Sequence, residues 1–362
     1  MSVDGGPELV QLLTPEGVLA SDPEYALSLT DEQWRDRYVD LVMVRRLDAE
    51  ATALQRHGEL GLWAPCQGQE AAQVGAARAT RPSDRIFPTY REHGMAYVRG
   101  VDPVTLLGLF RGTTMGGWDP ADHGFSLYTV VIGDQTLHAV GYAMGVQRDG
   151  TDDAVLVCFG DGASSQGDVA ESFVYAAVND APVVFFCQNN QWAISEPLER
   201  QTRIPLFKRA AGYGFPGVRV DGNDVLAVEA VVTTALDRAR AGGGPTLVEA
   251  FTYRMGAHTT SDDPSRYRTT AEGEAWKLKD PIERVRAHLV RSGIADAAFM
   301  AEVEARADAL GEHMRRSCGA MPDPTPTSMF DHLYAAEHPL VERDRQWLTT
   351  YLSGFADAGR GH

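Results

Sequence analysis

The sequence predicts an α/β fold in which a doubly wound, mostly parallel sheet is flanked by helices. Two apolar runs of strand length, residues 154–159 and 182–187, enclose a helical stretch at residues 168–180. Strands that are apolar throughout are typical of a parallel sheet that is covered on both faces. This strand–helix–strand order therefore indicates the centre of such a sheet, with an N-terminal arm before it and C-terminal helices after it.

The segments before this centre follow a different pattern. Residues 1–30 are acidic, rich in Pro and Gly and without periodicity, so we expect an arm that lies over a neighbouring subunit. Residues 31–56 carry apolar side chains at a spacing of three to four, which predicts a helix with Asp31 as its N-cap.

The segments after the centre continue the sheet. Further strands are predicted at residues 217–220 and 246–252, with a helix between them that begins near Asn223 and ends at the glycine run 242–244. Beyond residue 280 only helices are predicted. The expected domains are the arm (1–30), the α/β domain (31–280) and a C-terminal helical region (281–362).

Composition excludes several classes of protein. The 362 residues carry a formal net charge of −17, which argues against a nucleic-acid binder. No lysine follows a glycine, so the phosphate-binding loop of P-loop NTPases is absent. The apolar runs are too short to span a bilayer, and no basic residue precedes Arg35. We therefore expect a soluble, cytoplasmic protein.

Polar residues follow two of the predicted strands. Gly160-Asp161-Gly162 comes directly after one strand, and Gln188-Asn189-Asn190 ends the next. Because parallel strands end at the same edge of a sheet, we expect Asp161 and Asn190 to lie close together. Carboxylate and amide oxygens are ligands suited to Mg²⁺. The pattern therefore indicates a magnesium ion whose main task is to hold a diphosphate.

Two other interpretations of this segment remain. Asp-Gly is a common turn dipeptide, so Gly160-Asp161-Gly162 could be a plain turn. A nicotinamide-binding site would need the pattern G-x-G-x-x-G, but position 165 is Ser and the next glycine is Gly167. The nicotinamide interpretation is therefore excluded, and the turn remains an alternative.

Four ordered motifs resemble one family of thiamine-diphosphate enzymes. The motifs are GQEAAQVG (68–75), PTYREHG (88–94), GDGASSQGDVAESFVYAAVNDAPVVFFCQNNQWAIS (160–195) and TYRMGAHTTSDDPSRYR (252–268). Together they are similar to the alpha subunit of the decarboxylating first component of 2-oxo acid dehydrogenase complexes. The resemblance covers roughly residues 35–335 and implies the thiamine-diphosphate-binding fold.

The resemblance assigns roles to individual residues. It implies that Asp161 and Asn190 bind Mg²⁺ through their side chains and Trp192 through its backbone carbonyl. Arginine forms planar, bidentate contacts with phosphate oxygens. The residues implied to bind the diphosphate are Tyr90, Arg91 and Arg254, together with the backbone N–H groups of Gly162 and Ala163 at the start of the 168–180 helix region. The backbone at Val130 and Ile132 would contact the aminopyrimidine ring of the cofactor.

The resemblance also implies an active-site histidine at His258. A lone histidine is more often structural, but this one lies four residues after Arg254 and opens a polar loop, 258–268. We expect it to donate a proton to substrate intermediates or to stabilise their charge. His93, in the Tyr-Arg motif, is a weaker candidate that could simply support its loop.

The implied function is that of an alpha subunit. It would act in oxidative decarboxylation of a branched-chain 2-oxo acid and in reductive acylation of the lipoyl group of an acyltransferase component. The family's catalytic glutamate lies on a second α/β domain, and no second parallel-sheet pattern follows residue 255. We therefore expect a beta subunit as partner, in a tetramer of two alpha and two beta chains.

Several functional alternatives stay open. Within the family they are the acetyl-transferring pyruvate dehydrogenase and acetoin dehydrogenase; the run HTTSDD (258–263) looks closer to branched-chain members. A self-sufficient decarboxylase would need a second α/β domain. A non-catalytic Mg²⁺–phosphate binding module would have no need of His258 or the Arg254 loop.

The sequence departs from the family pattern in two places. Some branched-chain members hold a potassium ion in the loop aligned to 129–135, and here Gln135 matches while Thr129, Val131 and Asp134 differ. In animal enzymes a serine beside the active-site histidine is phosphorylated. Here that position is Thr259, so we do not expect the same control.

Overall fold

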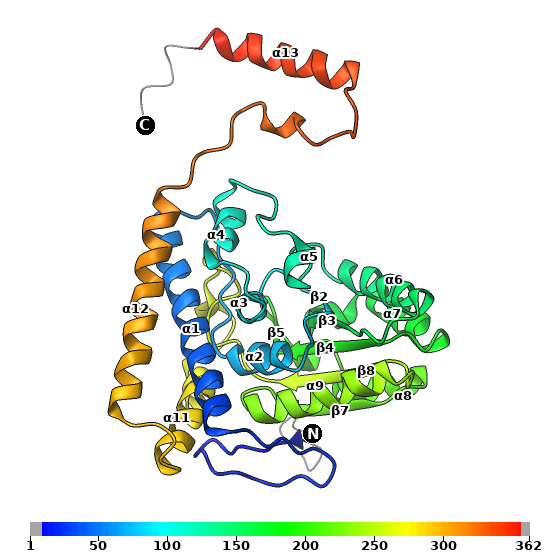
Figure 1. The fold of residues 1–362 in the computed structure, drawn as a ribbon, viewed down its shortest axis with the longest axis vertical. Helices are drawn as coiled ribbons and strands as arrows, with labels where there is room; N and C mark the ends of the chain where they lie inside the picture. Colours follow the sequence, from blue (N-terminus) through cyan, green and yellow to red (C-terminus); the bar gives the residue numbers. More distant parts are fainter. Residues whose placement is uncertain (1–8, 356–362) are drawn as a thin grey trace. The chain divides into compact units, whose positions relative to one another are not determined.

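The computed structural model describes residues 9–355 and divides the chain into two compact units, with the boundary between Gly319 and Ala320. The first unit is built on a six-stranded sheet in the order β1-β7-β8-β4-β3-β2 (Figure 1), and all of its strand pairs are parallel. The strands are β1 (Leu9–Val10), β2 (Arg85–Phe87), β3 (Val155–Gly160), β4 (Val183–Asn189), β7 (Gly217–Asp221) and β8 (Thr246–Phe251). The predicted α/β class with a parallel sheet is confirmed.

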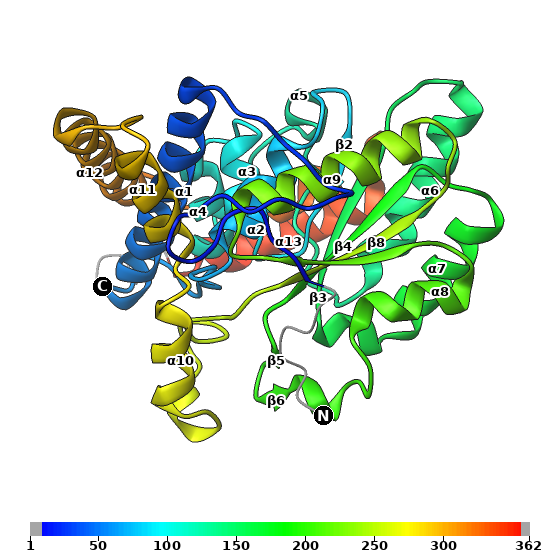
Figure 2. The same cartoon turned by 90° about the horizontal axis from the view of Figure 1, so that it is seen from below.

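Helices cover both faces of this sheet (Figure 2). One face of β3 and β4, which includes Val157 and Phe185, packs with buried residues of α6 (Asp134–Asp149), α7 (Gly167–Val178) and α8 (Arg209–Tyr213). On the other face, α9 (Val225–Arg240) contacts β4, β7 and β8, and α2 (Glu70–Arg78) packs on α9. This two-sided cover explains why the central strands are apolar throughout.

The remaining elements frame this core. The other helices of the first unit are α1 (Asp31–Arg56), α3 (His93–Val98), α4 (Pro103–Arg111), α5 (Pro120–His123), α10 (Thr270–Lys277), α11 (Pro281–Arg291) and α12 (Ala297–Gly319). Short 3₁₀ turns are η1 (Gly162–Ser165), η2 (Leu198–Arg200), η3 (Leu206–Lys208) and η4 (Pro264–Arg266), and a two-stranded hairpin joins β5 (Trp192–Ala193) to β6 (Glu196–Pro197).

The predicted elements agree with these bounds to within about two residues, with one correction at a helix start. The first helix spans Asp31–Arg56 as expected, but its N-cap is Thr30 and not Asp31. The Thr30 hydroxyl accepts from the Gln33 N–H at 3.2 Å, and the Gln33 side chain accepts from the Thr30 N–H at 2.9 Å. This reciprocal pair is a capping box, which satisfies two backbone donors at once.

The N-terminal arm belongs to this chain's own fold wherever it is described. β1 pairs with β7, and the N–H groups of Leu12 and Leu13 donate to the Asp224 carboxylate at 2.7 and 2.6 Å. Leu13 is fully buried. The expected placement of the arm over a neighbouring subunit is therefore wrong for residues 9–13. The sequence did not indicate β1, because a strand of two residues leaves no periodic pattern. Residues 1–8 lie outside the described part.

The C-terminal helical region is shared between the two units. α11 and α12 belong to the first unit, where both pack on α1. The second unit contains η5 (Ser328–Phe330) and α13 (Pro339–Ser353), on which the rings of Trp347 and Tyr351 stack at 5.5 Å. Among residues 9–355 we find no helix with the length and apolar content needed to cross a membrane.

Candidate active site

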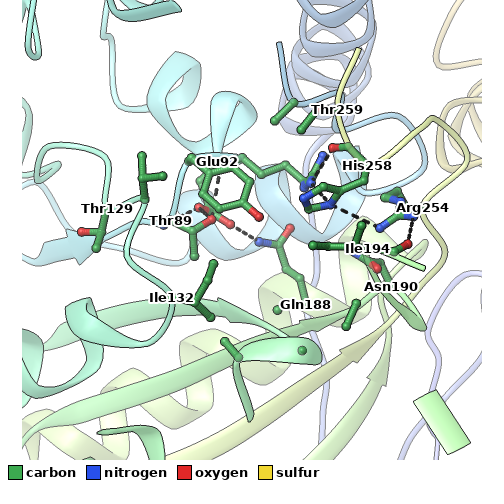
Figure 3. Close-up of a pocket in the computed structure, with 18 of the residues that line it drawn as sticks. Thr89, Glu92, Thr129, Ile132, Gln188, Asn190, Ile194, Arg254, His258 and Thr259 are labelled. Atoms are coloured by element: carbon green, nitrogen blue, oxygen red, sulfur yellow. Dashed lines mark hydrogen bonds between the residues drawn. The ribbon is translucent and has the colours of Figure 1, made fainter. Parts of the chain in front are cut away.

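One cavity at the carboxyl edge of the sheet contains every residue that the resemblance had assigned to the site. Its volume is about 470 Å³. Figure 3 shows lining residues from several segments of the chain, among them Thr89, Asn190 and His258. The assigned residues that line it are Tyr90, Arg91, Val130, Ile132, Asp161, Gly162, Ala163, Asn190, Trp192, Arg254 and His258. Segments separated by up to 168 residues of chain, from Tyr90 to His258, thus form one site.

The predicted metal ligands lie on adjacent strand ends. β3 and β4 are neighbours with Gly160 opposite Gln188, so Asp161 and Asn190 each emerge just past the sheet. Asp161 is only 1% exposed, and burial raises its pKa to about 6, against smaller opposing effects from backbone N–H groups, Arg254 and Gln201. A carboxylate buried in this way is stabilised when a cation sits beside it.

A strained loop brings a backbone carbonyl to the same place. Gln191 and Ile194 have φ angles of 71° and 57°, which side chains with a Cβ rarely adopt and a β-branched residue adopts least of all. The turn directs the Trp192 and Ile194 carbonyls at Arg254, whose guanidinium donates to them at 3.0 and 2.7 Å. Strain of this kind is concentrated at functional sites.

The donor set fits a hard divalent ion bound together with an anion. Asp161, Asn190 and the Trp192 carbonyl are all oxygen donors, as Mg²⁺ requires, but they contain a single carboxylate. Within residues 9–355 no group of three or more His, Cys, Asp or Glu side chains could hold a metal alone. An ion at this position therefore needs further oxygens from a ligand such as a diphosphate.

Two buried arginines give the cavity a positive wall. Arg91 donates to the Pro65 and His258 carbonyls at 2.6 and 2.9 Å, and Arg254 also donates to the Tyr267 hydroxyl at 2.9 Å. Burial, and then the charge of Arg91, lowers the pKa of Arg254. Neither guanidinium forms an ion pair in the described residues, and Arg254 Nε has no hydrogen-bond partner there. The wall is thus complementary to an anion.

His258 is held as a neutral imidazole. Arg91 Nη2 lies 3.2 Å from His258 Nδ1, and a guanidinium can only donate, so Nδ1 accepts and the ring proton is on Nε2. Burial, with Arg91 and Arg254, lowers the pKa of His258 to about 4. The Asp262 carboxylate accepts from the His258 N–H at 2.8 Å and from the Tyr267 hydroxyl at 2.5 Å, which secures the loop.

His93 has a different environment and does not line the cavity. Its Nε2 donates to the Ala64 carbonyl at 2.9 Å, its Nδ1 lies 2.8 Å from the Tyr128 hydroxyl, and its ring stacks on Trp63 at 4.0 Å. Burial lowers the pKa of His93 to about 3. Both ring nitrogens are already used, so this histidine supports the loop.

The backbone contacts assigned to Gly162 and Ala163 come from a 3₁₀ turn. Both residues belong to η1, which precedes α7, so they do not lie on the predicted helix itself. A Cβ on Gly162 would lie 2.7 Å from the Ala193 Cβ, so only glycine fits without a shift. Val130 and Ile132, which also line the cavity, are exposed by 67% and 41%.

Sequence reasoning missed the residues that hold the assigned ones in place. Glu92 accepts from the Thr89 N–H and hydroxyl and from Gln188 Nε2 at 2.6 Å, and burial raises the pKa of Glu92. Gln201 Nε2 donates to Asp161 at 3.2 Å. Glu92 and Gln188 lie inside two of the recognised motifs, close in sequence to Arg91 and Asn190, and this position could have marked them as supporting residues. No feature of the sequence indicated Gln201.

The comparisons with known proteins agree with this geometry. Residues 39–327 match the family described as "Dehydrogenase E1 component". The chain belongs to this family. The resemblance inferred from the four motifs is thereby confirmed, and this family consists of thiamine-diphosphate-dependent 2-oxo acid dehydrogenases, which are enzymes.

Full-length relatives from two kinds of complex are similar to this E1 chain. The "3-methyl-2-oxobutanoate dehydrogenase subunit alpha" of Mycobacterium tuberculosis is 46% identical over 354 residues, which cover 98% of this chain and 96% of the relative. The "Pyruvate dehydrogenase E1 component subunit alpha" of Staphylococcus aureus is 38% identical over 330 residues, covering 90% and 89%. This chain is therefore an E1 alpha subunit over nearly its whole length.

Proposed function

We propose that this E1 alpha subunit serves a branched-chain 2-oxo acid dehydrogenase that oxidises 3-methyl-2-oxobutanoate and passes the acyl group to the lipoyl group of an acyltransferase. The observation that supports the reaction is the buried Asp161, which shares a cavity with two arginines that form no ion pair within residues 9–355. The observation that favours the branched substrate is the higher identity to the 3-methyl-2-oxobutanoate enzyme, 46% against 38%.

In this proposal the chain holds thiamine diphosphate through Mg²⁺. Asp161, Asn190 and the Trp192 carbonyl would bind the ion, and the diphosphate would accept hydrogen bonds from Arg91, Arg254 and Tyr90. Gly162 and Ala163 line the same cavity, and their N–H groups would donate to the diphosphate. The backbone at Val130 and Ile132 would contact the ring system. When bound, thiamine diphosphate supplies the electron sink that makes loss of CO₂ possible.

The chain's own residues bind and orient the substrate, and His258 offers it a proton. His258 is neutral at pH 7, because its pKa is about 4, so its Nε2–H can donate a hydrogen bond without carrying a charge. Arg91 fixes the ring by its contact with Nδ1, 3.2 Å away. In this arrangement a substrate carbonyl or carboxylate oxygen is the natural acceptor from Nε2.

The site would be completed by a beta subunit, in a tetramer of two alpha and two beta chains. Residues 9–355 contain one large sheet and one two-stranded hairpin, and no second α/β domain. Val130, Val131 and Ile132 at the cavity are exposed by 67%, 69% and 41%. Apolar side chains exposed beside a cavity are typical of an interface. Light scattering of the co-expressed chains would measure the stoichiometry.

The test of the proposed function uses the chain co-expressed with its beta subunit. With Mg²⁺ and thiamine diphosphate, reduction of an artificial electron acceptor is followed with 3-methyl-2-oxobutanoate, with pyruvate and with acetoin. We expect the highest kcat/KM for 3-methyl-2-oxobutanoate. Preference for pyruvate or acetoin would move the chain to another E1 class, and cofactor binding without any turnover would support the non-catalytic alternative.

A further inference from the structure

A buried glutamine at the start of α2 lies in the cavity and takes no part in the assignments above. Gln69 is 1% exposed, and it lines the cavity together with Arg91, Asp161 and Asn190. It occupies the N-cap position of α2, yet its side chain forms no hydrogen bond to that helix. Glutamine is not among the residues preferred at an N-cap, so the capping role does not explain it.

The hydrogen bonds around Gln69 fix which of its side-chain atoms is which. The Trp192 N–H donates to Asn190 Oδ1 at 3.2 Å, so the other side-chain atom of Asn190 must be the Nδ2 donor. Asn190 Nδ2 in turn donates to Gln69 at 3.1 Å, so that atom of Gln69 is Oε1. The remaining atom is Nε2, a donor.

Gln69 Nε2 is buried and has no hydrogen-bond partner among residues 9–355. Leaving a buried N–H without an acceptor is costly, and such groups in native proteins call for an explanation. The nearby groups that line the cavity include two arginine side chains and Asn190, whose amide is already used. An anionic ligand in the cavity would provide the missing acceptor.

The backbone on both sides of Gln69 is held rigidly. Gly68 has a φ of 94°, and a Cβ there would lie 2.3 Å from the Tyr253 carbonyl oxygen, so only glycine fits. The Gln69 N–H donates to the Cys66 carbonyl at 2.9 Å, and the Gln69 carbonyl accepts from the Gln73 N–H at 3.1 Å. Nε2 is therefore preorganised for its acceptor.

We propose that Gln69 is a further cofactor-binding residue: its Nε2 donates to a diphosphate oxygen, while its Oε1 orients Asn190 for the metal. The inference rests on the proposed function, since it takes thiamine diphosphate with Mg²⁺ as the ligand. Both ends of one carboxamide are then used, one to position a metal ligand and the other to bind the anion.

The main test compares two variants of Gln69 in the co-expressed complex. Gln69→Glu keeps the acceptor toward Asn190 and removes the donor, and Gln69→Met removes both at similar volume. In calorimetric titrations with Mg²⁺ present, we expect Gln69→Met to bind thiamine diphosphate about ten- to a hundredfold more weakly, the effect of one hydrogen bond to a charged group. Gln69→Glu should bind more weakly still, because its charge repels phosphate.

The matched control is Gln73, a buried glutamine on the same helix whose side chain is fully bonded. Its Nε2 donates to the Arg91 carbonyl at 3.0 Å and to Gln188 Oε1 at 3.2 Å, and its Oε1 accepts from the Gly94 N–H at 2.8 Å. We expect Gln73→Met to lower the thermal midpoint of the cofactor-free complex clearly more than Gln69→Met does, because the Gln69 side chain forms a single hydrogen bond there. An equal loss in both variants would make Gln69 structural and overturn the inference.

A second probe locates the contact. Inorganic diphosphate with Mg²⁺ should lose affinity for Gln69→Met by the same factor as thiamine diphosphate does. A loss that is confined to thiamine diphosphate would place the contact elsewhere on the cofactor and refute the diphosphate assignment. If the wild-type complex does not bind thiamine diphosphate, the proposed function itself fails; if it binds and the Gln69 variants bind equally well, only this inference fails.

Discussion

Two buried aspartates lie at opposite ends of two neighbouring parallel strands and differ in how the protein balances their charge. Asp84 directly precedes β2, and Asp161 directly follows β3, its parallel neighbour. Their exposed fractions are 0% and 1%. Burial is therefore the same for both, and any difference between them comes from their partners.

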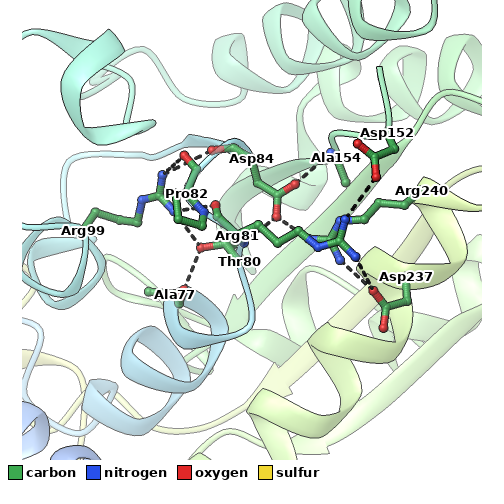
Figure 4. A network of polar contacts seen from close by, with 10 residues as sticks. All are labelled: Ala77, Thr80, Arg81, Pro82, Asp84, Arg99, Asp152, Ala154, Asp237 and Arg240. Atoms are coloured by element: carbon green, nitrogen blue, oxygen red, sulfur yellow. Dashed lines mark hydrogen bonds and ion pairs between the residues drawn. The ribbon is translucent and has the colours of Figure 1, made fainter. Parts of the chain in front are cut away.

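Asp84 is surrounded by donors that belong to the fold (Figure 4). Its carboxylate accepts from the backbone N–H groups of Arg81 and Ala154 at 2.7 and 2.9 Å, and it forms an ion pair with Arg240 at the end of α9. These contacts join the starts of β2 and β3 to the end of a helix. A buried carboxylate that is satisfied in this way is part of the structure.

Asp161 accepts a hydrogen bond from one other side chain, Gln201 Nε2 at 3.2 Å, and its pKa is raised to about 6 by burial. The histidines repeat this contrast, because both ring nitrogens of His93 are bonded within the fold, whereas the described contacts of His258 leave Nε2 for a ligand. Burial alone thus does not identify a functional residue. The informative feature is a buried polar group whose partners in the protein are incomplete.

The same substitution at the two aspartates tests this contrast most strongly. Asp161→Ala should weaken Mg²⁺-dependent binding of thiamine diphosphate by about a thousandfold or more, ~4 kcal/mol, because the only carboxylate of the metal site is lost. The thermal midpoint of the cofactor-free complex should not fall. Retained affinity in a calorimetric titration would refute the ligand assignment.

Asp84→Ala should have the opposite profile. Removing this carboxylate leaves two backbone N–H groups without their acceptor. Arg240, whose side chain is only 6% exposed, keeps only the exposed Asp237 as an ion-pair partner. Breaking a buried pair in this way costs about 3–5 kcal/mol of folding free energy. Denaturant unfolding would measure that loss. The folded fraction of Asp84→Ala should bind the cofactor as the wild type does. A loss below ~1 kcal/mol would contradict the structural role.

The pH dependence of stability gives a second test of Asp161. Burial raises the pKa of Asp161 from 3.8 to about 6, so the folded state binds the proton more tightly than the unfolded state. Stability from this group is therefore greatest below about pH 4 and falls by about 3 kcal/mol as the pH rises to about 6. The difference in unfolding free energy between Asp161→Ala and cofactor-free wild type should grow over this range in favour of the variant. A difference that does not change with pH would show that the carboxylate is compensated in the fold.

The two histidines extend the comparison to turnover. His258→Ala should reduce kcat by about a hundredfold and leave cofactor affinity nearly unchanged, since a positioned proton donor contributes that much. His93→Ala should instead lower the thermal midpoint, because it removes the stacking on Trp63 and both hydrogen bonds. Unchanged kcat in His258→Ala would return that histidine to a structural role.

The sequence predicted the parts of the molecule that follow from local pattern. The apolar runs identified β3 and β4, and the polar residues at their ends correctly placed Asp161 and Asn190 at one edge of the sheet. Contacts between distant segments could not be predicted in this way. The pairing of Asp84 with Arg240, 156 residues later, and the donor from Gln201 depend on how helices pack, and β1 is too short to show a period.

The smallest expected effect comes from the exposed side of the Asp84 network. Asp152 pairs with Arg81 at 3.4 Å, but the two side chains are 83% and 50% exposed. Exposed pairs of this kind contribute about 0–1 kcal/mol, because water screens the attraction and two long side chains lose freedom. Asp152→Asn should therefore change the unfolding free energy by less than ~1 kcal/mol. A loss of unfolding free energy as large as that of Asp84→Ala would mean that the total charge of the network stabilises the fold. The buried contacts of Asp84 would then not be the source of that stability.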